Sequence, residues 1–186
     1  MSAMKSVVLF ALLLAATFAA AQESNPELKK LVEEDQAART TKPNSDWMAV
    51  LKDDAKRRVL VRKMIDSGKL HTAEDYYGAA AVFQHGSEPD DFLLAHSMAM
   101  IATAKGEKKG LWLAAVTLDR YLQSKKQPQI YGTQFTFTDN SPVTQQPYNK
   151  SLITDELRKE LGVSTLAVQD AQLKQLQSSR PAPSKK

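Results

Sequence analysis

Residues 92–104 are apolar on almost every side, and this feature constrains the fold more than any other in the chain. The preceding Pro89-Asp90-Asp91 opens a helix and places acids in its first turn, where they interact favourably with the helix dipole. A helix that is apolar all round has to be covered by neighbouring elements. The sequence therefore predicts a helical domain in which this helix is the central and most buried one.

Helix signals surround this segment on both sides. Residues 24–27 have capping-box spacing, and apolar residues then recur at a helical period until Lys42-Pro43. Further caps and stops predict helices over about 45–67 and 72–86, another around 111–122, and two more after Thr154 and Ser164. The side chains that we expect to be buried are Trp47, Leu51, Ala55, Val59 and Ile65 on the second helix and Phe92, Leu94, Ala95, Met98, Ile101, Leu111, Leu118 and Leu122 on the fourth and fifth.

The pattern changes beyond Lys125. Residues 133–138 alternate apolar and polar side chains of β-forming type, 139–142 suit a turn, and 143–144 can return as a second short strand. The prediction is a mainly α domain of about six to seven helices with one short β-hairpin near 133–144. This domain spans residues 22–177, and we expect the basic Ser- and Pro-containing tail, 178–186, to be disordered.

The first 21 residues have the organisation of a secretory signal peptide. Lys5 precedes an uncharged apolar stretch, residues 7–18, and Ala19-Ala20-Ala21 supplies small residues for cleavage. A membrane anchor is the rival interpretation, but the stretch is at the short end of the roughly 20 residues that span a bilayer. We therefore expect cleavage after Ala21 and a secreted or periplasmic protein with no stable membrane anchor.

Composition narrows the function classes. The chain contains no cysteine, so an exported domain of this sequence relies on its core without disulfides, and cysteine nucleophiles, cysteine-ligated zinc and iron–sulfur clusters are excluded. The net charge of +4 is small and the basic residues alternate with acids, which argues against nucleic-acid binding. The three histidines lack metal-pair spacing and no phosphate loop is present, so we expect no metal and no cofactor.

Polar residues in apolar surroundings are the candidates for chemistry. Asp35 and Arg39 continue an apolar helix face, Asp119 shares a helix row with apolar residues, and His85 ends a helix. A structural interpretation makes these an ion pair, a partnered carboxylate and a helix-capping histidine. The functional interpretation makes His85 a general acid or base oriented by Asp119 or Asp35. The residues that we consider for ligand binding are Arg39, Gln84, His85, Arg120, Gln129, Tyr131, Thr133 and Gln134.

The same residues occur in a recurring order. Asp35-Gln36 with Arg39 is followed by Gln84-His85, Asp119-Arg120 and the segment Gln-Ile-Tyr-Gly-Thr-Gln at 129–134. Arg158 and Leu161-Gly162 extend the pattern, which covers about residues 28–162. In this pattern the chain resembles an uncharacterised bacterial domain family, a domain of unknown function. The resemblance implies a helical fold and brings no established activity, so no functional role can be transferred.

Two function classes remain open on the sequence. One is a binding or interaction module with an unknown ligand or protein partner, and the other is a small acid–base enzyme, a hydrolase or transferase. Both require the polar residues to meet, and scattered positions would count against the enzyme. The residues expected to meet are Asp35, Arg39, Gln84, His85, Asp119, Arg120, Tyr131 and Gln134.

Overall fold

The computed structural model describes residues 22–40, 47–138 and 141–179. Within these ranges the chain forms seven helices and one two-stranded antiparallel hairpin, which confirms the predicted mainly α fold. The predicted signal peptide, the first two residues of the helix expected over about 45–67, and the tail from residue 180 lie outside the described residues. No helix in the described ranges is both long and apolar enough to cross a membrane.

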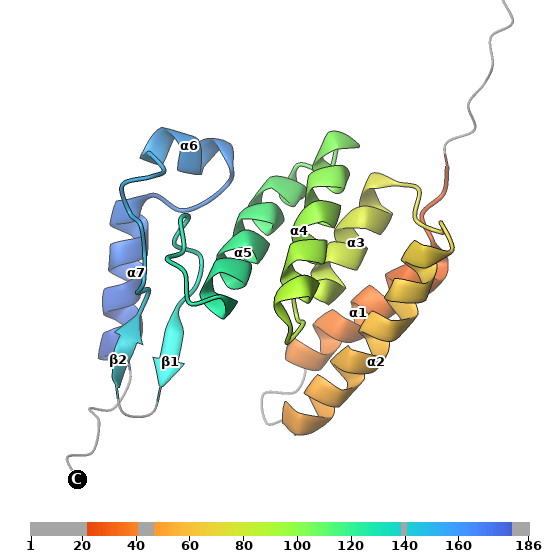
Figure 1. Ribbon diagram of the computed structural model, residues 1–186, viewed down its shortest axis with the longest axis horizontal. Helices are drawn as coiled ribbons and strands as arrows, with labels where there is room; N and C mark the ends of the chain where they lie inside the picture. Colours follow the sequence, from red (N-terminus) through yellow and green to blue (C-terminus); the bar gives the residue numbers. More distant parts are fainter. Residues whose placement is uncertain (1–21, 41–46, 139–140, 180–186) are drawn as a thin grey trace, which may run out of the picture.

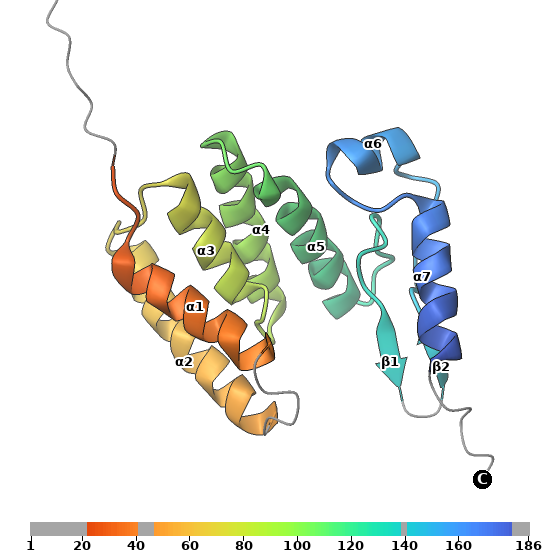
Figure 2. The same ribbon diagram turned by 180° about the vertical axis from the view of Figure 1, so that it is seen from behind.

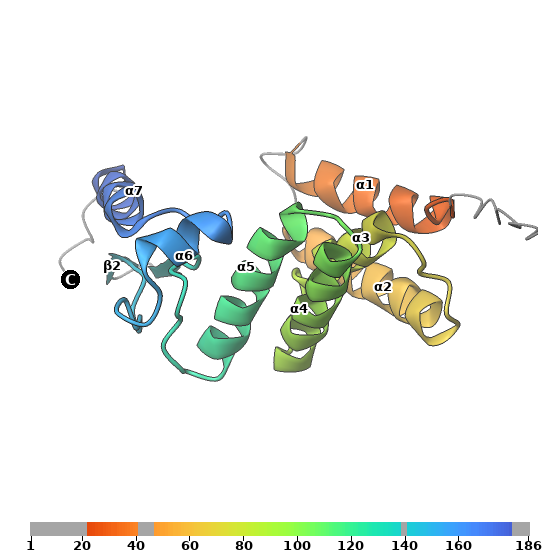
Figure 3. The same ribbon diagram turned by 90° about the horizontal axis from the view of Figure 1, so that it is seen from above.

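Five helices make up the N-terminal part. They are α1 (Pro26–Thr40), α2 (Trp47–Asp66), α3 (Ala73–Phe83), α4 (Pro89–Ala104) and α5 (Lys109–Ser124). Helices α3, α4 and α5 stand in a row joined by short turns, and α1 and α2 lie together beside the α3 end of that row (Figures 1 and 2). Viewed from above, the remaining elements lie on the other side of α5 (Figure 3).

The enclosed helix is α3 rather than α4. Helix α3 contacts α1, α2, α4 and α5, and its small residues Ala79, Ala80 and Ala81 are all buried. The expectation that α4 is covered all round is wrong, since Met100 on α4 is 52% exposed. Neighbours flank α4 in the row, and no described element covers its outward face. The buried core comprises Leu28, Leu31, Val61, Met64, Leu70, Ala79, Ala80, Val82, Phe83, Ala95, Met98, Ala99, Leu113 and Ala114.

The expected inner face of α2 is also wrong. Trp47 and Val59 are each 57% exposed, whereas Asp54 and Arg57 are buried. Charged residues occupy the inner face because they pair with a neighbouring helix, and apolar periodicity alone cannot show such pairs. Among the core residues expected on α4 and α5, Phe92, Ala95 and Met98 are buried, Ile101 is exposed, and Leu94, Leu111, Leu118 and Leu122 are half-buried.

The C-terminal part, residues 129–179, contains β1 (Thr136–Thr138), β2 (Ser141–Thr144), α6 (Asp155–Glu160) and α7 (Leu166–Ser178). Strand β1 begins later than predicted, because residues 129–134 form a loop held against α5 instead of extended strand. Residues 141–142 pair in β2 instead of turning. Buried polar side chains outnumber buried apolar ones in this part: Gln129, Gln145, Arg158 and Gln169 against Val143, Tyr148 and Val163.

Candidate functional site

A cluster of charged side chains lies where α1, α2 and the end of α3 meet. We call it the charged cluster and define it as Asp35, Arg39, Asp54, Arg57 and His85. Asp35 and Arg39 are four residues apart on α1 and therefore share a face, and Asp54 and Arg57 have the equivalent three-residue spacing on α2. His85 follows Gln84, the C-cap of α3. Helix periodicity thus places the four α1 and α2 charges against each other.

Two buried carboxylates hold the charged cluster together. Asp35 and Asp54 are 1% and 2% exposed. Arg39 joins them, with Nη1 3.0 Å from Asp35 Oδ1 and Nη2 2.6 Å from Asp54 Oδ2. Arg57 donates from Nη2 to Asp54, and its Nε lies 3.7 Å from Asp35. Each carboxylate therefore faces two guanidinium groups, which compensates for its burial.

Asp35 also orients the ring of His85. The His85 Nδ1 atom lies 3.1 Å from Asp35 Oδ2 and 3.2 Å from Oδ1. The backbone carbonyl of His85 accepts a hydrogen bond from Arg58 Nη1 at 3.1 Å, so α2 fixes the backbone as well. A proton on Nδ1 donated to the carboxylate leaves Nε2 with its lone pair. The His85 side chain is 17% exposed, so it is partly accessible to solvent.

Arg120 on α5 is the cation next to this cluster. Burial, and secondly the positive charge of Arg39, lower the pKa of Arg120 below its usual value. Within the described ranges Arg120 takes part in no hydrogen bond or ion pair, and its buried Nε has no partner. The half-buried Gln84 uses its backbone N–H to cap α3, while its side chain makes none of the hydrogen bonds found among the described residues.

Asp119 belongs to a second set of contacts. We call it the amide cluster and define it as Asp119 with the loop 129–134. The Asp119 side chain is fully buried. It accepts hydrogen bonds from the backbone N–H groups of Ile130 at 2.8 Å, Tyr131 at 3.1 Å and Thr133 at 3.0 Å, and from the Thr133 hydroxyl at 2.9 Å. Both carboxylate oxygens are thus used to hold the loop on α5.

Glutamine side chains complete the amide cluster. Gln129 donates from Nε2 to the carbonyls of Gln134 and Gln145 and accepts from the Gln134 N–H at 3.0 Å. Gln134 Nε2 donates to the Thr133 hydroxyl at 2.9 Å. The phenol of the partly buried Tyr131 has a pKa raised by burial and, less, by Asp119. Loop residues that looked available for a ligand therefore serve mainly to fix the loop.

The described contacts divide the predicted site residues between the two clusters. Asp35, Arg39 and His85 meet in the charged cluster, whereas Asp119 and Gln134 meet in the amide cluster. Among the hydrogen bonds and ion pairs of the described residues, none joins His85 to Asp119. The link between the clusters is the dipeptide Asp119-Arg120, whose side chains leave α5 about 100° apart around the helix axis.

Sequence reasoning missed important members of both clusters. Asp54 and Arg57 lie in a mixed-charge run that resembles a solvated helix face, although their three-residue spacing is a signal for an ion pair. Gln169 on α7 and Tyr148 also hold the loop, since Gln169 Nε2 donates to the Tyr131 carbonyl at 2.8 Å and the Tyr148 hydroxyl donates to the same carbonyl at 3.1 Å. Their distance along the chain leaves no local sequence signal.

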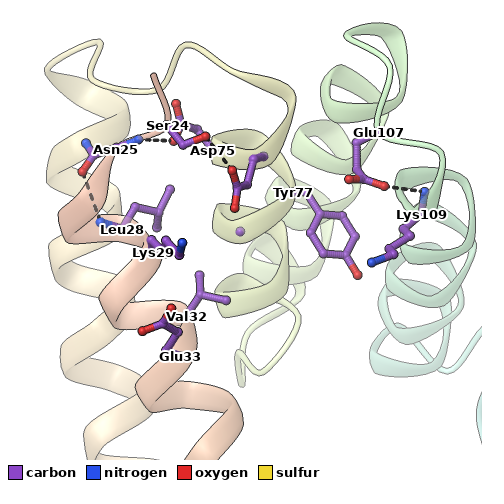
Figure 4. A pocket seen from close by; sticks show the side chains of 12 residues that line it. Ser24, Asn25, Leu28, Lys29, Val32, Glu33, Asp75, Tyr77, Glu107 and Lys109 are labelled. Atoms are coloured by element: carbon purple, nitrogen blue, oxygen red, sulfur yellow. Dashed lines mark hydrogen bonds between the residues drawn. The ribbon is translucent and has the colours of Figure 1, made fainter. Parts of the chain in front are cut away.

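The hollow in Figure 4 lies elsewhere, between α1, α3 and the start of α5. It has a volume of about 380 Å³, with Leu28 and Val32 among its apolar lining residues. Its polar lining is already paired in part, because Asp75 accepts from the Asn25 N–H and Glu107 from the Lys109 N–H. None of the site residues predicted from the sequence lines this hollow.

Comparisons with known proteins add no assignment to this geometry. The chain matches no family model, no curated protein and no solved structure. Within the described residues, no three His, Cys, Asp or Glu side chains are grouped so that they could hold a metal ion. The function therefore has to be argued from the two clusters.

The charged cluster makes the fold sensitive to acid. Burial alone would raise the pKa of Asp54, but hydrogen bonds and charges from Arg57 and Arg39 outweigh it and lower the pKa below its usual 3.8. The folded state then binds this proton less readily than the unfolded state, so the free energy of unfolding falls as the pH drops from about 4 through the lowered pKa. Urea unfolding at a series of pH values measures the effect.

The control is the variant Asp54→Asn, which carries no titrating group at this position. The stability difference between the two proteins should be largest near neutral pH and shrink below about pH 4. A difference that stays constant down to about pH 2 would show that Asp54 titrates alike in the folded and unfolded chain.

Gly132 allows the amide cluster to close, which predicts a stability loss in Gly132→Ala. Its φ is +78°, and a Cβ atom would overlap the Gln169 side-chain oxygen and the Tyr148 ring. Gly68 is the matched control, because its φ is +65° while a Cβ there would meet nothing within 4 Å. We expect both alanines to carry backbone strain of about 1 kcal/mol and Gly132→Ala to lose roughly 1–3 kcal/mol more. Equal losses in denaturant unfolding would contradict the close packing at Gly132.

Proposed function

We propose that this chain is an exported binding module whose ligand contacts the outer side chains of the charged cluster, together with the neighbouring Arg120. The orientation of His85 carries the proposal. A buried carboxylate, Asp35, holds one ring nitrogen, and the other has no partner among the described residues. A histidine held at one ring nitrogen has its other nitrogen, Nε2, oriented in a defined direction.

A purely structural role explains only part of the cluster. The Arg39–Asp54 and Arg57–Asp35 pairs join α1 to α2 and need no ligand. His85 and Arg120 add a further titratable group and a further cation, although the two carboxylates are already paired. A ligand site accounts for these two residues, whereas helix positioning does not.

Nuclear magnetic resonance of the histidine rings tests binding directly. The mature protein is titrated with small molecules of three classes: uncharged, cationic and anionic. We expect at least one class to shift the His85 ring signals in a saturable way. His71, which is exposed, and His96, whose Nδ1 lies 2.9 Å from the Ala114 carbonyl oxygen, are internal controls that should not move. His85 signals that stay unchanged with all three classes of molecule would contradict the binding proposal.

The second candidate function is a small acid–base enzyme, a hydrolase or transferase. The Asp35–His85 contact favours it, because a carboxylate at Nδ1 orients a histidine that acts as a base through Nε2. Asp119, the other carboxylate considered, accepts hydrogen bonds from the loop 129–134 with both of its oxygens. If the enzyme assignment holds, Asp35 rather than Asp119 is the positioning residue.

Turnover separates the enzyme from the binding module. Chromogenic esters, phosphate monoesters and glycosides are incubated with the wild-type protein and with His85→Gln and His96→Gln. The enzyme candidate requires turnover that His85→Gln abolishes and His96→Gln leaves intact. Turnover that survives His85→Gln excludes His85 as the base, and its absence for all substrates favours the binding module.

Export is part of the proposal and gives a prediction of its own. Protein recovered from a secreting host should begin at or very near Gln22, because the small residues at 19–21 suit signal peptidase. Intact-mass measurement checks the N-terminus. Full-length chain retained in a washed membrane fraction would show that residues 7–21 form an anchor. The resemblance to the bacterial domain family remains a prediction that supports a bacterial, secreted or periplasmic setting.

A further inference from the structure

We propose that Arg120 and Arg39, beside His85, bind the oxyanion group of a small ligand, a carboxylate or a phosphate monoester. The inference rests on the proposed function and names the ligand class of the same site. It starts from an imbalance of charge where α1, α2 and the end of α3 meet, next to Arg120 on α5, which is close enough to feel the charge of Arg39.

Among the described residues, the two carboxylates of the charged cluster do not balance its arginines once Arg120 is counted with them. Two buried carboxylates face the guanidinium groups of Arg39 and Arg57, and Arg120 adds a third positive charge. One positive charge is therefore in surplus while His85 is neutral, and two when it is protonated. Arg58 does not change this count, because it pairs with Asp91 across 3.4 Å.

The hydrogen-bond donors of Arg120 also indicate that a negatively charged partner is missing. A guanidinium group has five N–H donors, and those of Arg120 have no acceptor among the described residues. Its Nε is shielded from solvent, so bulk water cannot take the place of an acceptor there. Arg57 and Arg158 also have a shielded Nε without an acceptor, but other donors of both guanidinium groups are bonded, whereas Arg120 has no bonded donor among the described residues. An unsatisfied buried polar group calls for a specific explanation.

The carboxylate next in sequence, Asp119, accepts no hydrogen bond from Arg120. Asp119 directs both oxygens at the loop 129–134, where four donors share them. The C-terminal ends of α1 and α3 contribute partial negative charge near Arg39 and His85, which favours cations there. Such helix ends provide no hydrogen-bond acceptor to Arg120, and no described residue does so either, from which we infer that a bound ligand supplies the counter-charge.

The chemistry of the free groups selects the ligand class. The planar guanidinium fork matches the paired oxygens of a carboxylate or a phosphate. Arg39 is 19% exposed and His85 is 17% exposed, and Arg120 is also partly exposed, so an oxyanion can reach them from solvent. A cationic ligand would add to the surplus charge, and an uncharged one would leave it uncompensated.

The test uses the mature protein and two probes, inorganic phosphate and acetate, at constant ionic strength set with sodium chloride. Binding is followed through the His85 ring signals, with His71 and His96 as internal controls. We expect saturable binding of at least one probe and at least about tenfold weaker binding in Arg120→Gln. Arg62→Gln is the matched control, because it removes the same charge from an exposed surface pair and should bind like the wild type.

The outcomes separate the inference from the function on which it rests. Saturable shifts with an anion that are lost in Arg120→Gln support it. Shifts that are equal in Arg120→Gln and the wild type overturn it, as do shifts of His85 with uncharged or cationic molecules alone. In this last case the binding proposal stands and the ligand class is wrong. No shift with any class overturns both.

A second variant and a second comparison keep the test decisive. Should Arg120→Gln fail to fold, Arg120→Lys keeps the charge without the fork, and weaker binding than wild type is expected. Wild-type protein that does not distinguish phosphate or acetate from chloride contradicts the inference without any variant. Phosphate binding without acetate binding indicates a phosphate ligand, and the reverse indicates a carboxylate.

Discussion

Asp119→Ala should destabilise the fold by about 3–5 kcal/mol. The substitution removes the acceptor for the N–H groups of Ile130, Tyr131 and Thr133 and for one hydroxyl. Each buried donor left without an acceptor costs about 1–3 kcal/mol. Denaturant unfolding followed by circular dichroism measures the loss.

Asp170→Ala is the control for removing a carboxylate from the same part of the chain. Asp170 forms a surface ion pair with Lys150, and both side chains are 40% exposed or more, so its removal should cost less than about 1 kcal/mol. A similar small loss in Asp119→Ala would mean that the loop 129–134 does not depend on this carboxylate.

Asp35→Ala should cost about 3–5 kcal/mol for a different reason. It leaves Arg39, Arg57 and His85 around a cavity without the buried anion that they share. Breaking a buried pair leaves uncompensated charge, which costs more than the pair contributes when intact. Thermal and urea unfolding measure the loss.

Asp53→Ala provides the comparison on the neighbouring helix. Asp53 pairs with Lys56 on the surface, where both side chains are more than half exposed, so its loss should leave stability almost unchanged. The double variant Asp35→Ala with Arg39→Ala should lose less than the sum of the single variants, because their contacts are shared. Additive losses would contradict a coupled cluster.

The helices were predictable because their signals are local. Thr72 caps α3 with a complete capping box through Asp75, and residues 89–91 begin α4 as expected. The inner face of α2 was not predictable from apolar periodicity, since Asp54 and Arg57 replace apolar side chains there. Their burial depends on Arg39 of another helix, and the sequence of α2 alone does not indicate this pairing.

The sequence predicted several residues of the candidate site, but not how they are grouped in space. Asp35, Arg39 and His85 do meet, because a charged residue on an apolar helix face needs a partner. Asp119 was expected near His85 and instead holds the loop that follows its own helix. Neighbouring residues on α5 point in directions about 100° apart, so Asp119 and Arg120 can lie against different surroundings although they are adjacent in the sequence.

The polar interior of residues 129–179 has a thermodynamic consequence. Exposure of apolar surface raises the heat capacity on unfolding, and exposure of polar surface lowers it. Much of this interior is filled by polar side chains, namely Gln129, Gln145, Arg158 and Gln169. Detaching the C-terminal part from α5 should therefore change the heat capacity little for a unit of this size. The five-helix part, whose core is apolar, should show the usual large change.

The two parts should therefore respond differently to cooling. Hydrophobic stabilisation of the helical core weakens at low temperature, whereas the hydrogen bonds of the C-terminal part carry no such penalty. Amide hydrogen exchange resolves opening events of this kind residue by residue. Near room temperature the backbone N–H groups of Ile130 and Thr133 should exchange in a separate, smaller opening than those of α3, and the gap between the two should narrow in the cold.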